Sequence, residues 1–211
     1  MKRTSLLFGI ALIAFVALSQ SGVGAVNKTF AERFAGGPAI GDSGVYTFDK
    51  AHSFIGFKVK HSGLIEVPGF FRDFTGTVNF DAKDISKSTV EFTAKTTSVD
   101  TGVAGRDNHL RTKDFFEVET YPDITFKSTK VAKKGKGWMV TGDLTMKGVT
   151  KSITFPFEIS GWLAPDERSG GKMGITAETE LNRREYGVNY PNTVVSDQIK
   201  VVLQIEAGKK K

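Results

Sequence analysis

A short basic segment near the middle of the chain holds the residues best suited to chemistry. Arg106 and Arg111 bracket His109, so two guanidinium groups and one imidazole fall within six residues. Arginine binds carboxylates and phosphates through paired donors, and the N–H groups at a helix N-terminus favour the same anions. The apolar pair Phe115-Phe116 follows closely, so an anion site beside an apolar space is expected. That arrangement suits the head group of an amphiphile.

A simpler interpretation of the same segment stays open. Arg106 and Arg111 could pair with neighbouring carboxylates at the surface, such as Asp100, Asp107 or Asp114. Exposed ion pairs of this kind contribute little to stability and bind no ligand.

Other kinds of reactive site have little support. The three histidines show no spacing typical of metal ligands. His52 and His61 fall nine residues apart on one predicted strand, so they should point to opposite faces. The chain has no cysteine, which excludes thiol chemistry and disulfides. We therefore expect no metal site, no cofactor and no catalytic residue.

The elements that carry these residues are predicted to be strands. From Gly44 onward, apolar, β-branched and aromatic residues alternate with polar ones, and turn residues interrupt them every ten or so positions. Eight such segments each have one dry face, which predicts an all-β antiparallel sandwich or barrel. Residues 100–122 break the alternation and predict a short helical insertion between the third and fourth strands. Pro156 predicts a bulge or an edge in its strand.

The alternation also predicts which side chains share the dry face. The first segment contributes Ile55, Phe57, Val59 and His61. The others contribute Phe70, Phe74, Gly76, Val78 and Phe80; Val90, Phe92 and Ala94; Ile124 and Phe126; Trp138, Val140, Leu144 and Met146; Ile153, Phe155, Phe157 and Ile159; Ile175, Ala177, Thr179 and Leu181; and Ile199, Val201, Leu203 and Ile205. An eight-stranded barrel of this size is either just filled by side chains or holds one small ligand.

The N-terminus has the order of a secretory signal peptide. Lys2 and Arg3 precede an apolar stretch that is too short to span a bilayer, and small residues follow it up to Ala25. We expect a signal peptide over 1–25, a flexible arm over 26–43 and the barrel domain over 44–209. The protein should then be periplasmic or secreted. Its formal charge of +6 therefore does not predict a nucleic-acid partner.

An ordered set of short motifs resembles the YceI-like family of periplasmic polyisoprenoid-binding proteins. The motifs run over most of the chain after the expected arm, from Val45 to Ala207. They are Tyr46-Thr-Phe-Asp49, His52-Ser53, Phe57-Lys-Val-Lys-His61, Gly69-Phe-Phe71, Phe74-Thr-Gly76, Asp100-Thr-Gly102, Arg106-Asp107, His109-Leu110, Asp114-Phe-Phe116, Tyr121-Pro122, Phe126-Lys-Ser128, Gly142-Asp-Leu-Thr145, Gly148-Val-Thr150, Asn182-Arg183 and Tyr186-Gly187.

The resemblance implies a lipocalin-like barrel whose apolar tunnel binds an isoprenoid or another long-chain lipid for transport, storage or sequestration. It is compatible with a homodimer and with transient contact at a membrane surface. We expect the head group to be held by Arg106, Asp107, His109, Arg111 and Arg183. The expected tunnel residues are Ile55, Phe57, Val59, His61, Phe74, Val78, Phe92, Phe115, Phe116, Ile124, Phe126, Leu144, Phe155 and Phe157.

Two alternatives from other functional classes stay open. The protein could be a hydrolase or transferase acting on a prenyl pyrophosphate or lipid, with His61 or His109 as general base and Asp107 orienting it. It could also be a cell-envelope interaction protein whose barrel is filled by its own side chains. The non-enzymatic lipid-binding protein is the function that we expect.

Overall fold

The computed structural model describes residues 41–135, 137–165, 167, 170–191 and 194–209. The predicted signal peptide, and the predicted arm up to residue 40, lie outside the described residues. Among the helices of the described part, none is long and apolar enough to span a bilayer.

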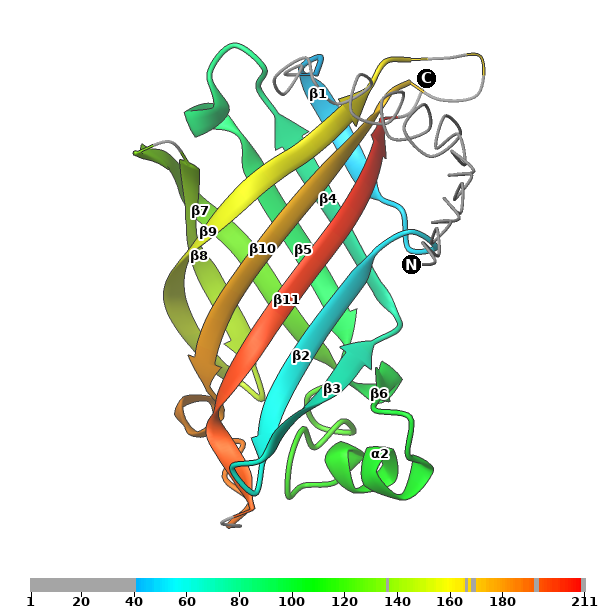
Figure 1. The fold of residues 1–211 in the computed structure, drawn as a ribbon, viewed down its shortest axis with the longest axis vertical. Coiled ribbons are helices and arrows are strands. Elements are labelled where there is room, and N and C mark those ends of the chain that lie inside the picture. The colour runs from blue at the N-terminus through cyan, green and yellow to red at the C-terminus, as the bar shows by residue number, and fades with distance from the viewer. Residues whose placement is uncertain (1–40, 136, 166, 168–169, 192–193, 210–211) are drawn as a thin grey trace, which may run out of the picture. The chain divides into compact units, whose positions relative to one another are not determined.

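Strands make up most of the described chain, and Figure 1 shows them wound into one barrel. The strands are β1 (Gly44–Phe48), β2 (Phe54–His61), β3 (Ile65–Phe71), β4 (Phe74–Phe80), β5 (Thr89–Lys95), β6 (Val99–Asp100), β7 (Asp123–Lys134), β8 (Gly137–Met146), β9 (Val149–Leu163), β10 (Lys172–Asn182) and β11 (Val195–Lys209). The helical segments are η1 (Ile85–Lys87), η2 (Thr96–Ser98), α2 (Ala104–Arg111) and η3 (Arg183–Tyr186).

The eleven described strands occupy eight barrel positions. β1 and β2 together fill one position, because both pair antiparallel with β11, at different places along its length. β4 and β3 fill the second position, since β4 pairs with β1 and β3 pairs with β2. β5 and β6 fill the third, since β5 pairs with β4 and β6 pairs with β3. Strands β7 to β11 fill the other five positions, and the β1–β11 pairing closes the ring. The predicted eight-stranded antiparallel barrel is confirmed.

One predicted strand is in fact two, and the break changes which residues face inward. The chain turns at Arg72 and Asp73, between β3 and β4, so the alternation does not continue from Phe70 to Phe74. Phe71 is buried, whereas Phe70 packs against Phe54 with ring centroids 5.7 Å apart. The prediction that Phe70 shares the inner face of Phe74 is therefore wrong.

The helical insertion lies where the sequence predicted it, between the third and fourth barrel positions. α2 follows β6, and Figure 1 shows it at the end of the barrel where β2 turns into β3. Leu110 and the following turn are tied together, because the Phe116 N–H donates to the Leu110 carbonyl over 3.0 Å. The insertion therefore sits beside one end of the barrel interior.

The strand with Pro156 changes its pairing next to this residue. Pro156 pairs with Met139 of β8, while the pairing of β9 with β10 ends at Phe157 and Ala177. Toward the α2 end, β9 and β10 have no register pair among the described residues. The predicted edge at Pro156 is confirmed, and a proline without an N–H donor is accommodated there.

The inner and outer faces should differ in their contribution to stability. Phe74 is only 3% exposed, while Phe54 is 36% exposed. We expect Phe74→Ala to lower the free energy of unfolding by about 3–5 kcal/mol. The control Phe54→Ala should cost only about 1 kcal/mol, mainly its edge-to-face contact with Phe70. Urea titration of both variants measures the difference, and equal losses would contradict the assigned faces.

Candidate functional site

The barrel encloses a cavity of about 610 Å³ at its α2 end. Phe57 shows how the wall is built, since its ring lies over Gly69, the residue opposite it on β3, where a Cβ would collide with the ring. Eleven of the fourteen predicted tunnel residues line this cavity. They are Ile55, Phe57, Val59, His61, Phe92, Phe115, Phe116, Ile124, Phe126, Leu144 and Phe155.

The other three predicted tunnel residues lie elsewhere. Val78 and Phe157 line a second cavity of about 80 Å³, which reaches Phe80 and Met173. Phe74 lines neither cavity and packs in the core. The predicted tunnel residues therefore divide between two adjoining cavities, which we call the near chamber, at the α2 end, and the far chamber.

The near chamber also uses residues that sequence reasoning did not select. Ile199, Val201 and Leu203 were on a predicted dry face, so alternation alone could have selected them. Phe71 was missed because the strand was read without its break. Tyr190 lies outside regular strands, and nothing in its local pattern signals a place in the cavity wall.

The polar side of the near chamber begins with Arg106. The Arg106 guanidinium donates to the Thr101 hydroxyl over 2.7 Å and to the Thr101 carbonyl over 2.8 Å. Thr101 donates in turn to the buried carboxylate of Asp107, from its backbone N–H over 2.9 Å and from its hydroxyl. Arg106 and Thr101 line the cavity, and Asp107 does not. Asp107 therefore supports the position of Arg106 through Thr101.

His109 lies in the cavity wall within a group of three rings. Its ring centroid is 5.0 Å from those of both Phe115 and Tyr190, which lie 5.1 Å from each other. His109 also has a polar partner, since its Nε2 lies 2.9 Å from Oδ2 of Asp114. In the enzymatic alternative Asp107 would orient a histidine, but here Asp107 Oδ1 accepts from Thr101 and the carboxylate beside His109 is that of Asp114.

Arg111 does not reach the cavity, although it lies only two residues beyond His109. Its Nε donates to the Thr97 carbonyl and its Nη2 to the Val99 carbonyl, both over 2.8 Å. A third donor contacts Asn108 over 3.1 Å. The structure therefore gives Arg111 the role of fixing α2 to the segment before it, rather than the predicted contact with a head group.

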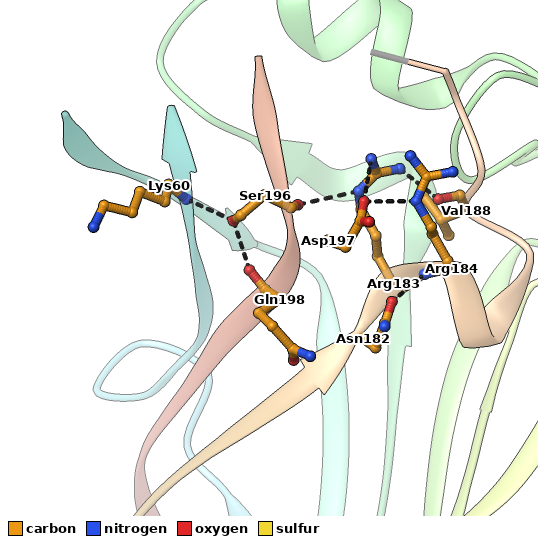
Figure 2. Close-up of polar contacts among 8 residues, drawn as sticks. All are labelled: Lys60, Asn182, Arg183, Arg184, Val188, Ser196, Asp197 and Gln198. Carbon is orange, nitrogen blue, oxygen red and sulfur yellow. Dashed lines mark hydrogen bonds and ion pairs between the residues drawn. The ribbon is translucent and has the colours of Figure 1, made fainter. Parts of the chain in front are cut away.

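Arg183 lines the near chamber from a break in the sheet. The register of β11 against β2 shifts between Val195 and Ile199, so several residues of β11 face Lys60 alone. Bulges of this kind redirect side chains and carbonyls. Figure 2 shows the result: Arg183 donates to the Ser196 carbonyl over 3.2 Å and to the Val188 carbonyl over 2.6 Å.

Asp197 completes this cluster by pairing with two arginines. Its Oδ1 lies 2.8 Å from Nη2 of Arg183 and 2.7 Å from Nε of Arg184, as Figure 2 shows. The hydrogen bond from Arg184 lowers the pKa of Asp197, and the charge of Arg183 acts in the same direction. Burial lowers the pKa of Arg183, but an arginine stays charged at neutral pH. Of these three residues only Arg183 lines the cavity, and it shares the single carboxylate of Asp197 with Arg184.

A separate cluster lies outside the cavity lining. One ligand atom each from Asp49, His52 and Glu206 lies within 4.8 Å of the others. His52 pairs with Asp49 at 2.8 Å, and Glu206 pairs with Lys172 at 2.6 Å, so these groups already have protein partners. His52 precedes β2, which corrects the prediction that it shares a strand with His61.

Comparisons with known proteins agree on the fold. The YceI-like domain family matches residues 46–207. Protein YceI of Escherichia coli O17:K52:H18 is 36% identical over 186 residues, covering 87% of this chain and 96% of that protein. The crystal structure of the Campylobacter jejuni YCEI protein aligns with a TM-score of 0.65 at 34% identity, covering 77% of this chain and 96% of that one.

A more distant structure shares the fold alone. It is a polyisoprenoid binding domain from Saccharophagus degradans, implicated in plant cell wall breakdown. It aligns with a TM-score of 0.61 at 16% identity, covering 77% of this chain and 97% of that one.

Arg183 should contribute more to the stability of the fold than the adjacent Arg184 does. Arg183→Ala leaves the carbonyls of Val188 and Ser196 without their donors, so we expect a loss of about 2–4 kcal/mol in unfolding free energy. Arg184→Ala removes a half-exposed partner of Asp197 and should cost no more than about 1 kcal/mol. Thermal and urea unfolding of both variants measure this. A loss for Arg184→Ala as large as that for Arg183→Ala would refute the ranking.

The Asp197 contacts should make stability depend on pH. The folded-state pKa of Asp197 lies below its ordinary value of 3.8, so the fold favours the ionised form. This contribution is present above about pH 4 and is lost as the pH falls through the folded-state pKa. Asp197→Asn should therefore lower stability at neutral pH and have little effect at about pH 2. Urea titrations at both pH values test this, and the same loss at both would count against it.

Proposed function

The chain belongs to the YceI-like domain family, and from that premise we propose that its barrel binds one long-chain amphiphilic lipid of the isoprenoid type. The tail would occupy the near chamber, and the head group would lie at the polar side formed by Thr101, Arg106, His109 and Arg183. The observation that carries the proposal is an apolar cavity of about 610 Å³ with cations at one side.

The cavity suits a lipid tail in size and lining. Its volume falls within the roughly 300–1,000 Å³ of ordinary ligand pockets. Aromatic and aliphatic side chains from both halves of the barrel form most of its surface, Phe57 and Leu144 among them. The Saccharophagus degradans domain, which has the same fold, is described as binding a polyisoprenoid. These observations support an isoprenoid or similar chain as the ligand.

The head group is argued from charge and desolvation. An ionised phosphate or carboxylate cannot enter an apolar chamber without paired donors. Arg106 is exposed and has no carboxylate among its hydrogen-bond partners in the described residues. Arg183 is a second cation that lines the same cavity, and its anionic partner Asp197 is shared with Arg184. An anionic or strongly polar head group is therefore favoured at this place.

The rim beside the near chamber supports exchange of the lipid with a membrane. Leu64, in the turn between β2 and β3, and Ile65, the first residue of β3, are 81% and 62% exposed. The Ser62 N–H donates to the Val194 carbonyl over 2.6 Å, which joins this turn to a cavity-lining segment. Exposed apolar side chains next to an opening favour transient contact with a membrane surface. A tail could then pass without crossing water.

The same site changes the orienting residue of the enzymatic alternative. A general base on a prenyl pyrophosphate needs a partner that orients it, and beside His109 this partner is Asp114, because Asp107 accepts from Thr101. His109 pairs with Asp114 and is packed between two rings. Because most of the cavity lining is apolar, we propose a binding protein that carries, stores or sequesters its lipid in the cell envelope, as the N-terminal sequence suggests.

The head-group contact can be tested with two probes that share one tail. Geranylgeranyl monophosphate carries a charged head, and geranylgeraniol a neutral one. Arg106→Ala should weaken binding of the monophosphate by about 1.5–3 kcal/mol, because one charge-assisted hydrogen bond is lost. Binding of the alcohol should weaken much less. The control Lys130→Ala removes an exposed cation on β7 that does not line the cavity. Native mass spectrometry or competition with a fluorescent lipid gives both affinities.

Each outcome has a distinct meaning. If neither probe binds the unaltered protein, and its organic extract holds no lipid, the proposed function fails. If Arg106→Ala weakens both probes equally, Arg106 shapes the opening and does not bind the head group. Turnover of geranylgeranyl pyrophosphate would instead favour the enzyme.

A further inference from the structure

The near and far chambers share part of their walls. Ile55, Leu203 and three phenylalanines line both. These five residues therefore lie where the two chambers meet. The three phenylalanines are Phe92, Phe126 and Phe155, which we call the phenylalanine partition.

Phe126 is the centre of the phenylalanine partition. Its ring stacks on Phe92 with centroids 5.6 Å apart and an interplanar angle of 24°. On its other side Phe155 lies 5.4 Å away. Phe126 is only 2% exposed and Phe155 5%. The three rings therefore form one continuous group on the inner wall made by β5, β7, β8 and β9.

A glycine allows this ring to lie where it does. Gly142 of β8 pairs with Ser128, two residues beyond Phe126, and a Cβ at Gly142 would collide with the Phe126 ring. The ring thus extends along the inner surface of β8 toward Phe155. The absence of a side chain at Gly142 therefore fixes where the Phe126 ring can lie.

The far chamber is lined mostly by apolar side chains. Its wall includes Val78, Phe80, Ile85, Met173 and Ile205, and the hydroxyl of Ser88 is occupied by the Asp81 N–H over 3.0 Å. A cavity of about 150 Å³ takes one benzene molecule. The far chamber, at about 80 Å³, is smaller than that cavity, so a tail end on the order of one isoprene unit needs the volume of the Phe126 ring in addition.

We propose that the phenylalanine partition is the stop that sets the length of tail the protein accepts, with Phe126 as the specificity-determining residue. The far chamber is the space that a longer tail occupies once the Phe126 ring is removed. This inference rests on the proposed function, because it assumes that a lipid tail fills the near chamber. It assigns a residue to the choice among prenyl chains, which the family membership does not do.

The test measures affinity along a series of prenyl alcohols that grow by isoprene units. Farnesol, geranylgeraniol, geranylfarnesol and longer prenols are bound to the full chain and compared by native mass spectrometry. The unaltered protein should show an affinity maximum at one length. Phe126→Ala should move that maximum by at least one isoprene unit. The first prenol beyond the original maximum should bind at least about tenfold tighter, since two further buried methylenes have about that effect.

Two further variants protect the test against a folding defect. Phe126→Leu keeps an apolar side chain but removes the ring, so a smaller shift in the same direction is expected. Phe92→Ala removes a half-buried ring of the same partition. The matched control is Phe116→Ala, since Phe116 lines the near chamber only. This control should change all prenols alike and leave the maximum in place.

The outcomes separate the two proposals. Absence of binding by every prenol would remove the proposed function and this inference together. Binding without a length maximum, or a maximum that neither Phe126→Leu nor Phe92→Ala moves, would overturn the inference and leave the proposed function standing. A shift caused equally by Phe116→Ala would show that cavity volume, rather than the partition, sets the length.

Discussion

Closure of an eight-stranded sheet limits the interior to a width that facing side chains can just span. Whether the barrel is solid or hollow then depends on which residues meet across it. Where Phe92, Phe126 and Phe155 meet, their rings line the junction of the two chambers. Toward α2, Phe57 lies against its own wall over Gly69, and a chamber of about 610 Å³ remains. Both the proposed lipid site and its limit in length follow from this one constraint.

The polar part of the site depends on interruptions of the same sheet. Regular strands pair their own N–H and C=O groups, so they offer little to a charged ligand. The bulge in β11 turns the Ser196 carbonyl toward Arg183. The α2 insertion brings Arg106 and His109 to the cavity. Apolar specificity therefore comes from the strands, and polar recognition comes from the places where strands are broken.

Much of the barrel could be predicted because alternation assigns each residue of one strand to a face. Ile55, Phe57 and Val59 follow this rule within β2. The rule fails across a break, which is why Phe71 was missed and Phe70 was misplaced. It also says nothing about where a long side chain ends. Arg111 turns to the carbonyls of Thr97 and Val99, and Tyr190 enters the cavity from a loop, because tertiary contacts decide both.

The pairing that closes the ring joins segments from opposite ends of the described chain. Tyr46 of β1 lies opposite Lys209 of β11, and β11 also pairs with β2. Contacts so distant in sequence give a high contact order, for which the loop-closure entropy must be overcome before the contact forms. Folding should be slow, on the order of milliseconds to seconds. Until β11 docks, the edges of β1 and β2 stay open to pairing with other chains. The last strand therefore governs both the folding rate and the risk of aggregation.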